Sequence, residues 1–244
     1  NEDILSAQRE EIVTLGSEIG GLHRQAARYL SGAGALLGEA RRLAAEALDR
    51  EKLRQFAARL AARELPDLGK QGQEALRLLS AVTDRGVILF HETISALCSR
   101  VIFLEDPYGA AAAELLSRLR DEAVTRGYHV ITCRCPLSPE KPDHLLIPQA
   151  GLAFVIGNSL HAVPLEGRAI HAQRFTDGGR LRARRVRLRF LQKTAGVLLR
   201  QAEQAIAEAH RRHDALERYY IGATDFAMVD RRAEALLAKL AAEM

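Results

Sequence analysis

The sequence predicts an α/β fold, with a mostly parallel sheet and long flanking helices. In the middle of the chain, short and fully apolar segments such as Val101–Leu104 and Leu152–Ile156 lie on either side of a helical segment at about 110–126. Strands that are apolar on both faces are typical of parallel sheets covered by helices on both sides. Both ends of the chain are rich in Ala, Leu, Arg and Glu, with apolar residues three and four positions apart, which predicts long amphipathic helices.

Two helices are expected before the sheet. The first covers residues 3–48 and contains six glycines, each of which weakens a helix by up to about 1 kcal/mol relative to Ala or marks close packing on a neighbouring helix. The second covers about 50–64, because Asp49 is a suitable N-cap and Pro66 stops the helix. The segment Pro66–Gly72 is the best candidate for a domain boundary.

The remaining elements follow from short apolar runs and then from helical periodicity. Strands are expected at Val87–Phe90, Val101–Leu104, Tyr128–Thr132, Leu145–Ile147 and Leu152–Ile156. Residues 160–181 are expected to be irregular and to end in a turn at Gly178–Gly179, before helices at 183–222 and 227–242. The expected parts are a helical tail of a preceding unit (1–66), an α/β domain (67–182) and a C-terminal helical hairpin (183–244).

The two helical ends resemble each other. Asp49 matches Asp225, 176 positions later, and Arg24–Ala26 matches Arg200–Ala202 at the same offset. In both cases a long helix, an acidic break and a short helix follow one another. We interpret this as an internal duplication, in which the tail of one unit precedes a second complete unit. The chain is therefore expected to be the C-terminal part of a longer protein.

Residues 100–116 have the strand, tight loop and helix layout of a phosphate-binding loop. The pattern G-x-x-x-x-G-K-[ST] uses glycines for the backbone cradle, lysine for the β- and γ-phosphates and a hydroxyl for Mg²⁺. Here Asp106 and Ala111 occupy the two glycine positions, Ala112 the lysine position and Ala113 the hydroxyl position. The candidate nucleotide site consists of these degenerate positions, namely Asp106, Gly109, Ala110, Ala111, Ala112 and Ala113.

The altered loop predicts impaired nucleotide binding. Without a lysine at position 112, a triphosphate loses its nearest fixed cation, and Glu105 and Asp106 would add like-charge repulsion. A helix N-terminus favours negative charge by about 0.3–1 kcal/mol, so the Asp106 carboxylate could itself occupy the anion position. The simpler alternative is an ordinary turn, with Asp106 as the helix cap and Pro107 as the first helical residue.

Other residues are candidates for catalysis or metal binding. Asp143 and His144 are expected in a loop before a strand, where a carboxylate could orient an imidazole as a general base, and Cys135 could act with His144 as a nucleophile. The simpler interpretation is a structural role in the loop for Asp143 and His144, and a role as a small buried apolar residue for Cys135. His129, Cys133 and Cys135 could share one face of a strand. Zinc needs four such ligands, and His144, His161 or His171 would have to complete the site, so no metal is expected.

Composition excludes several classes of protein. The chain has 244 residues, is 48% hydrophobic and 27% charged, and carries a net charge of +4 that is spread along its helices. The arginine-rich run at 180–189 would spread around a helix axis and lacks interleaved aromatic residues, so nucleic-acid binding is not expected. Three cysteines are too few for a disulfide framework, which favours a cytoplasmic protein, and no apolar run is long enough to span a membrane.

Five segments carry a resemblance to a known family. They are Arg126–Val130, Cys135–Pro148, Gly151–Val155, His213–Tyr220 and Ala223–Phe226. Together they resemble the second unit, with the helical tail of the first, of a bacterial family of two-unit P-loop ATPase-like proteins. The resemblance covers about 85–240 and implies a P-loop NTPase-like fold. ATP and Mg²⁺ are implied by the resemblance alone, because the family's glycine-rich loop is degenerate here. The resemblance implies an acidic Mg²⁺-supporting residue at the end of an apolar strand, where this chain has Gly157 and Asn158 and no carboxylate.

Three hypotheses about function follow. The first is a nucleotide-impaired unit with a structural or regulatory role beside an intact upstream P-loop unit of the same protein, or in a homo-oligomer. The second is a helical interaction or scaffolding module with no nucleotide role. The third is an active ATPase with a non-standard loop. Asp143, His144 and Asn158 are candidate accessory residues of the nucleotide site. Whether the chain is an enzyme is left open.

Overall fold

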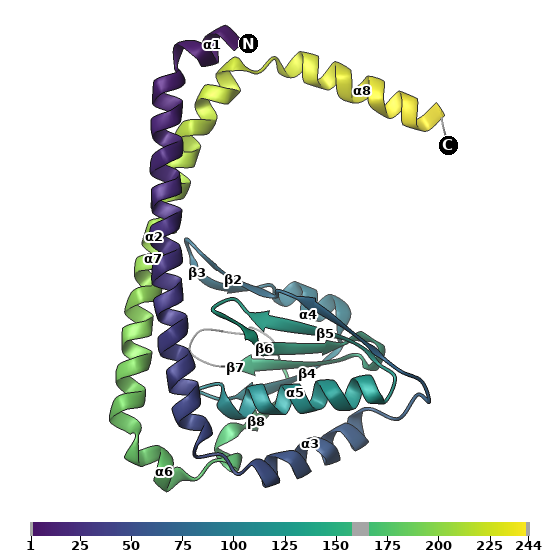
Figure 1. The fold of residues 1–244 in the computed structure, drawn as a ribbon. Coiled ribbons are helices and arrows are strands. Elements are labelled where there is room, and N and C mark those ends of the chain that lie inside the picture. Colours follow the sequence, from purple (N-terminus) through teal and green to yellow (C-terminus); the bar gives the residue numbers. More distant parts are fainter. Residues whose placement is uncertain (1, 158–165, 243–244) are drawn as a thin grey trace. The chain divides into compact units, whose positions relative to one another are not determined.

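The computed structural model describes residues 2–157 and 166–242 (Figure 1). The chain divides into two compact units. The larger unit comprises residues 27–203, and the smaller combines residues 1–26 with 204–244. The long helices α2 (Arg9–Ala45) and α7 (Arg185–Ala223) contribute residues to both units.

The larger unit is built on a six-stranded sheet with the order β1-β5-β6-β7-β4-β8. Its strands are β1 (Gln73–Arg77), β4 (Arg100–Glu105), β5 (His129–Cys135), β6 (Ser138–Ile147), β7 (Leu152–Gly157) and β8 (Arg168–His171). All neighbouring strands are parallel except at β6, which is antiparallel to both β5 and β7. The predicted α/β class with a mostly parallel sheet is confirmed.

Strand β6 departs from the expected alternation of strands and helices. Only Pro136 and Leu137 separate it from β5, and a parallel connection would need a crossover of a dozen or more residues. The two strands therefore form a hairpin. β6 begins at Ser138, well before the predicted Leu145–Ile147, because its first half is polar and carries no strand signal in the sequence.

One face of the sheet is covered by α5 (Ala110–Thr125) and by α3 (Arg50–Glu64), which lies against α5 (Figure 1). Leu53 and Leu60 of α3, Leu115 and Leu119 of α5 and Phe154 of β7 are buried in one apolar cluster. The predicted range of α3 is confirmed, and so is its N-cap, because the N–H of Lys52 donates to the Asp49 side chain at 2.9 Å. The sequence assigned this helix to a separate tail, yet its apolar side chains form part of the α/β core.

The opposite face carries a β-hairpin and a short helix. Strands β2 (Ser80–Thr83) and β3 (Gly86–Leu89) form a separate antiparallel sheet, followed by α4 (His91–Leu97). Leu89 and Ile94 are buried there with Leu146 of β6 and Val155 of β7. The expectation that Val87–Phe90 joins the main sheet was wrong, because this run pairs locally with the segment just before it.

Three further predictions at the edges of the sheet were incomplete. Strand β1 is an edge strand with exposed polar residues and gives no apolar signal. Strand β8, a 3-10 turn at Ala172–Phe175 and the start of α6 (Gly178–Ala183) lie in the stretch expected to be irregular, and another 3-10 turn, Pro148–Ala150, precedes β7. Gly178 and Gly179 begin α6 rather than form a turn, since the Asp177 side chain accepts hydrogen bonds from the N–H groups of Gly179 and Arg180.

Within the larger unit, α2 packs against α7. Ala33 and Ala40 of α2 and Leu188, Ala195 and Leu199 of α7 are buried where the helices meet. Ion pairs join Arg187 to Glu39 and Arg184 to Glu46. The glycines of α2 do not break the helix. At Gly34 the reason is close packing, since an added Cβ would come within 3.0 Å of the carbonyl oxygen of Leu137.

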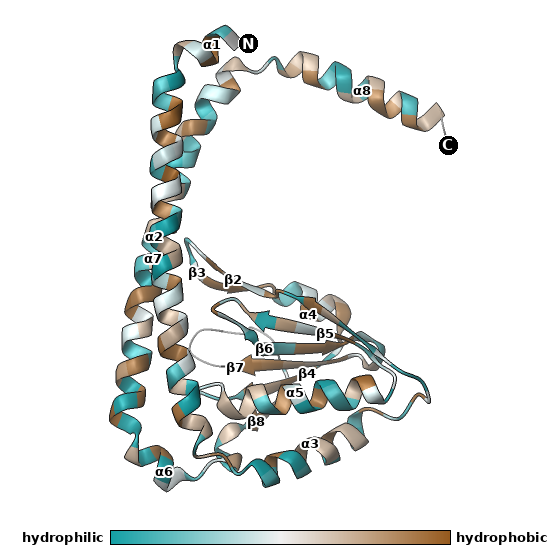
Figure 2. Ribbon diagram, in the orientation of Figure 1, coloured by the Kyte–Doolittle hydropathy of each residue, from teal (hydrophilic) through white to brown (hydrophobic). Residues whose placement is uncertain are grey.

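The smaller unit contains α1 (Glu2–Ala7), the first part of α2, the last part of α7 and α8 (Phe226–Ala242). Its two long helices are joined by an Arg212–Glu18 ion pair of 2.7 Å and by a hydrogen bond of 2.9 Å from the Tyr219 hydroxyl to Glu11. Helix α8 has no buried residue, although apolar side chains recur along it (Figure 2).

Helices α3 and α8 begin in the same way. α3 starts at residue 50 after Asp49, and α8 starts at residue 226 after Asp225, which keeps the offset of 176 positions. The Asp225 side chain accepts the N–H of Met228 at 3.0 Å, as Asp49 does that of Lys52. The buried positions of α3, Leu53, Ala57, Leu60 and Ala61, correspond at this offset to Val229, Ala233, Leu236 and Leu237, which are exposed in α8. The internal duplication stays a prediction, as do the domain ranges.

Candidate functional site

The loop between β4 and α5 contains the degenerate phosphate-loop positions. Its Asp106 is 3% exposed, and its carboxylate accepts two backbone hydrogen bonds, from the N–H of Tyr108 and from the N–H of Ala112, both at 3.0 Å. The second donor lies in the first turn of α5, where an acidic side chain satisfies an N–H group that the helix leaves unpaired. The carboxylate thus holds two of the N–H groups that an anion in this loop would need.

Gly109 is the N-cap of α5 and has a φ of +70°, a left-handed conformation that favours glycine. The helix begins at Ala110, so the expectation that Pro107 is its first residue was wrong. Ala110, Ala111 and Ala112 are buried, and Ala113 is partly buried. The lysine and hydroxyl positions of the pattern therefore hold small packing residues and supply no cation or metal ligand.

Glu105 does not share the position of Asp106. Its side chain is half-exposed and pairs with the imidazole of His171 on β8, with 2.5 Å between Oε2 and Nδ1. Asp106 alone of these two acidic residues faces the N–H groups of the loop. The sequence predicted that both carboxylates would repel a triphosphate in the loop. In the structure only the buried carboxylate of Asp106 lies on the N–H groups of the loop.

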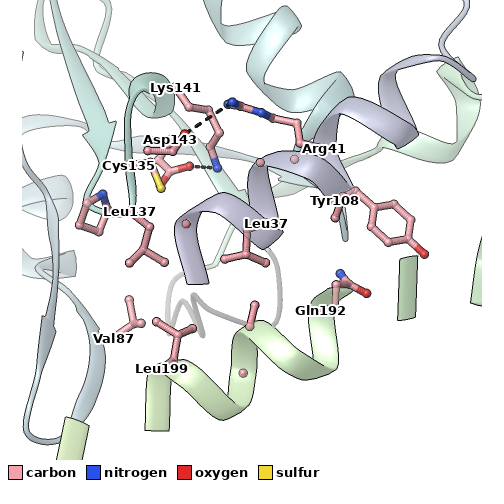
Figure 3. A pocket seen from close by; sticks show the side chains of 18 of the residues that line it. Leu37, Arg41, Val87, Tyr108, Cys135, Leu137, Lys141, Asp143, Gln192 and Leu199 are labelled. Carbon is pink, nitrogen blue, oxygen red and sulfur yellow. Dashed lines mark hydrogen bonds and ion pairs between the residues drawn. The ribbon is translucent and has the colours of Figure 1, made fainter. Parts of the chain in front are cut away.

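A cavity of about 330 Å³ adjoins this loop. Its walls come from α2, α7, the loop before α5, the turn between β5 and β6, and Val87 of the β2–β3 hairpin (Figure 3). The apolar part of the lining consists mainly of Leu37, Ala40, Val87, Leu137, Ala195 and Leu199, and the polar part of Arg41, Lys141, Asp143, Gln192, Arg200 and Glu203. Cavities of this size and mixed character are typical of small-molecule sites.

A buried ion pair lies in the wall of the cavity. Lys141 pairs with Asp143 on β6, and the side chains are 12% and 0% exposed. A Cβ added at Gly109 would lie 3.4 Å from the Lys141 ammonium. The phosphate-loop positions thus have a lysine beside them, but it comes from β6 and is held by a carboxylate.

Cys135 also lines the cavity, near Asp143 (Figure 3). Burial, and then the charge of Asp143, raises the pKa of Cys135 to about 11. The thiol is therefore protonated at neutral pH, and a protonated thiol is a poor nucleophile. Burial likewise raises the pKa of Cys133 to about 12. These environments favour the structural interpretation of both cysteines.

Asp143 and His144 lie within strand β6, so their expected placement in a loop was wrong. The polar sequence around them hid the strand. Successive residues of a strand point to opposite faces, so the two side chains diverge. His144 is buried and its Nδ1 accepts the N–H of Ile156 at 3.3 Å, while Asp143 faces the cavity. Asn158, the third accessory residue, lies outside the described residues.

Sequence reasoning missed most of the cavity. Arg41 lies on α2, where it pairs with Glu140 at 2.9 Å, and Gln192 lies on α7, where it donates to the carbonyl oxygen of Pro107 at 2.8 Å. Neither residue stands in a recognisable motif. The long separation along the chain between α2, the β5–β6 turn and α7 left no signal in the sequence except the glycines of α2, of which Gly34 packs closely on the β5–β6 turn.

Two further candidates from the sequence are the metal ligands and the arginine-rich run at 180–189. Within residues 2–157 and 166–242, no group of three or more His, Cys, Asp or Glu side chains is placed to hold a metal ion. His161 lies outside the described residues. In the arginine-rich run, Arg180, Arg184 and Arg187 form ion pairs with Asp177, Glu46 and Glu39, which ties part of this positive charge to the fold.

No helix in the described part of the chain combines the length and the apolar character needed to cross a lipid bilayer.

Comparisons with known proteins assign no family or function to the chain. The sequence matches no model of a protein family and no curated protein, and the fold matches no solved structure.

Proposed function

We propose that this chain is a P-loop NTPase-like unit that does not bind nucleotide in its own loop and serves a structural or regulatory role beside another α/β unit. The observation that carries the proposal is the pair of hydrogen bonds from Tyr108 and Ala112 to the buried carboxylate of Asp106. A phosphate could enter only by displacing this carboxylate. It would then find alanine where the pattern requires lysine.

Nucleotide titration tests the first half of the proposal. We expect no saturable binding of fluorescent Mg·ATP to the wild-type chain at micromolar concentrations. In a variant that combines Asp106→Gly, Ala111→Gly, Ala112→Lys and Ala113→Thr, we expect affinity to improve by at least about tenfold, because charge-assisted contacts to phosphate contribute about 1.5–3 kcal/mol each. Circular dichroism checks that the variant remains folded. Micromolar binding by the wild type that Gly109→Pro abolishes would contradict the proposal.

The second half of the proposal, a partner unit, is supported by the exposed apolar residues of α8. Val229, Leu236 and Leu237 occupy the positions at which α3 is buried against the α/β core, and they are 51%, 62% and 65% exposed. By analogy with α3, this face fits a helix like α5 on another α/β unit. A second copy of the chain offers no free surface of this kind, because its α5 is already covered by α3. We therefore propose an upstream unit of the same protein as the partner.

Hydrogen exchange tests the docking of α8. In the chain alone, we expect the amides of α8 to exchange rapidly, since no tertiary packing protects them. We expect protection when the chain is expressed together with the rest of its gene product. Leu236→Glu should remove this protection, while Arg231→Glu, on the polar face of the same helix, should leave it unchanged. A gene product with no further α/β unit, or equal protection in both variants, would contradict this partner.

A further inference from the structure

We propose that the cavity beside Gly109 binds a small organic anion with an apolar body, such as an aliphatic carboxylate or phosphate monoester. The proposal is independent of nucleotide binding in the loop. It uses the wall of α2 and α7 and the side chains of β6, none of which belongs to the phosphate-loop pattern. The N–H groups held by Asp106 take no part in it.

The cavity has the size and the apolar lining for the body of such a ligand. Its volume is about 330 Å³, within the range of small-molecule sites. Leu37, Val87, Leu137 and Leu199 point their side chains toward it from four different elements (Figure 3). Gly38 faces open space in the cavity, because a Cβ added there would meet no atom within 4 Å.

The charged side chains favour an anion. The lining contains three cationic residues, Arg41, Lys141 and Arg200, and two acidic ones, Asp143 and Glu203, while Arg41 already pairs with Glu140 outside the lining. Asp143 is the one ion-pair partner of Lys141 in the described part of the chain. An ammonium has three N–H donors, so donors remain for a second acceptor. Because Lys141 is only 12% exposed, an anion reaching it would be shielded from water, which strengthens the interaction.

Arg200 supplies a second cation at the rim. It lies on α7, one residue after the buried Leu199, and forms no ion pair within residues 2–157 and 166–242. A guanidinium binds carboxylate and phosphate through paired N–H donors. Lys141 at the inner wall and Arg200 at the rim thus offer two positions for the anionic group, with the apolar side chains around the rest of the ligand.

Titration of the whole chain with a matched ligand series tests the chemistry. Octanoate and monooctyl phosphate each carry an anionic group on an eight-carbon tail. The controls, 1-octanol and n-octylammonium, carry the same tail without an anionic group. Binding is measured by calorimetry. We expect saturable binding of at least one of the two anions, at least about tenfold tighter than that of the alcohol or the ammonium. The better of the two anions identifies the anionic group. Equal affinity for all four ligands, or no saturable binding of either anion, would overturn the proposal.

Matched variants test the location. Gly38→Leu fills the cavity and should weaken binding of the anion at least about tenfold. Gly16→Leu, on the same helix and also in open space, should not change it. Arg200→Gln should weaken binding about tenfold, and Arg189→Gln, an exposed arginine on the same helix that does not line the cavity, should leave it unchanged. Thermal melts verify that each variant folds. Wild-type affinity in both Gly38→Leu and Arg200→Gln would overturn the assignment to this cavity.

Discussion

Replacing Asp143 with alanine should cost about 3–5 kcal/mol of unfolding free energy, because it leaves the ammonium of Lys141 buried without its carboxylate. The Asp143 side chain is fully buried within β6, which packs next to β5 and α5. Urea unfolding followed by circular dichroism measures the loss. We expect the midpoint to fall, with a slope similar to that of the wild type.

Two controls separate the buried pair from ordinary surface charge. Arg54→Ala removes the ion pair with Glu51 on the exposed side of α3, and should change the free energy of unfolding little, because water screens exposed charges. The double variant Lys141→Met/Asp143→Leu should recover most of the stability lost in Asp143→Ala, because an apolar pair avoids the cost of desolvating two charges. If Asp143→Ala were as mild as Arg54→Ala, the Lys141–Asp143 pair would have no structural importance.

Substituting alanine at Gly34 and at Gly38 should have opposite effects, although both lie on α2. At Gly34 the new Cβ comes within 3.0 Å of the backbone carbonyl of Leu137, which cannot move without shifting the β5–β6 turn. Overpacking of this kind costs about 1–3 kcal/mol, partly offset by a gain in helix propensity of up to about 1 kcal/mol. We expect a net loss of about 1–2 kcal/mol in urea unfolding.

Gly38→Ala serves as the matched control. The new methyl group meets no atom within 4 Å, so only the helix propensity changes and the protein should gain up to about 1 kcal/mol. Gly16→Ala, also in open space on α2, should gain a similar amount. A stabilising Gly34→Ala would show that α2 and the β5–β6 turn do not lie in contact in solution.

The sequence predicted the elements whose signals are local. Asp49 as the cap of α3, and the apolar runs that become β4 and β7, need only neighbouring residues to be recognised, and all three are confirmed. Strand β6 was mostly missed because Ser138–Asp143 is polar, and a strand in the middle of a sheet is normally recognised by its apolar residues. The hairpin of β2 and β3 was misplaced because a short apolar run does not reveal its pairing partner.

The candidate site, like the fold, was predicted from the sequence only in part. The sequence by itself determined that the loop at 106–113 lacks the glycines, lysine and hydroxyl of the phosphate-binding pattern, because residue identity is all that this requires. Only the tertiary structure decided that the Asp106 carboxylate turns inward onto the N–H groups of Tyr108 and Ala112 while Glu105 turns away to His171. It also decided that Lys141, Arg41 and Gln192 meet beside Gly109. These residues lie far apart along the chain, and packing across such distances leaves no periodicity in the sequence.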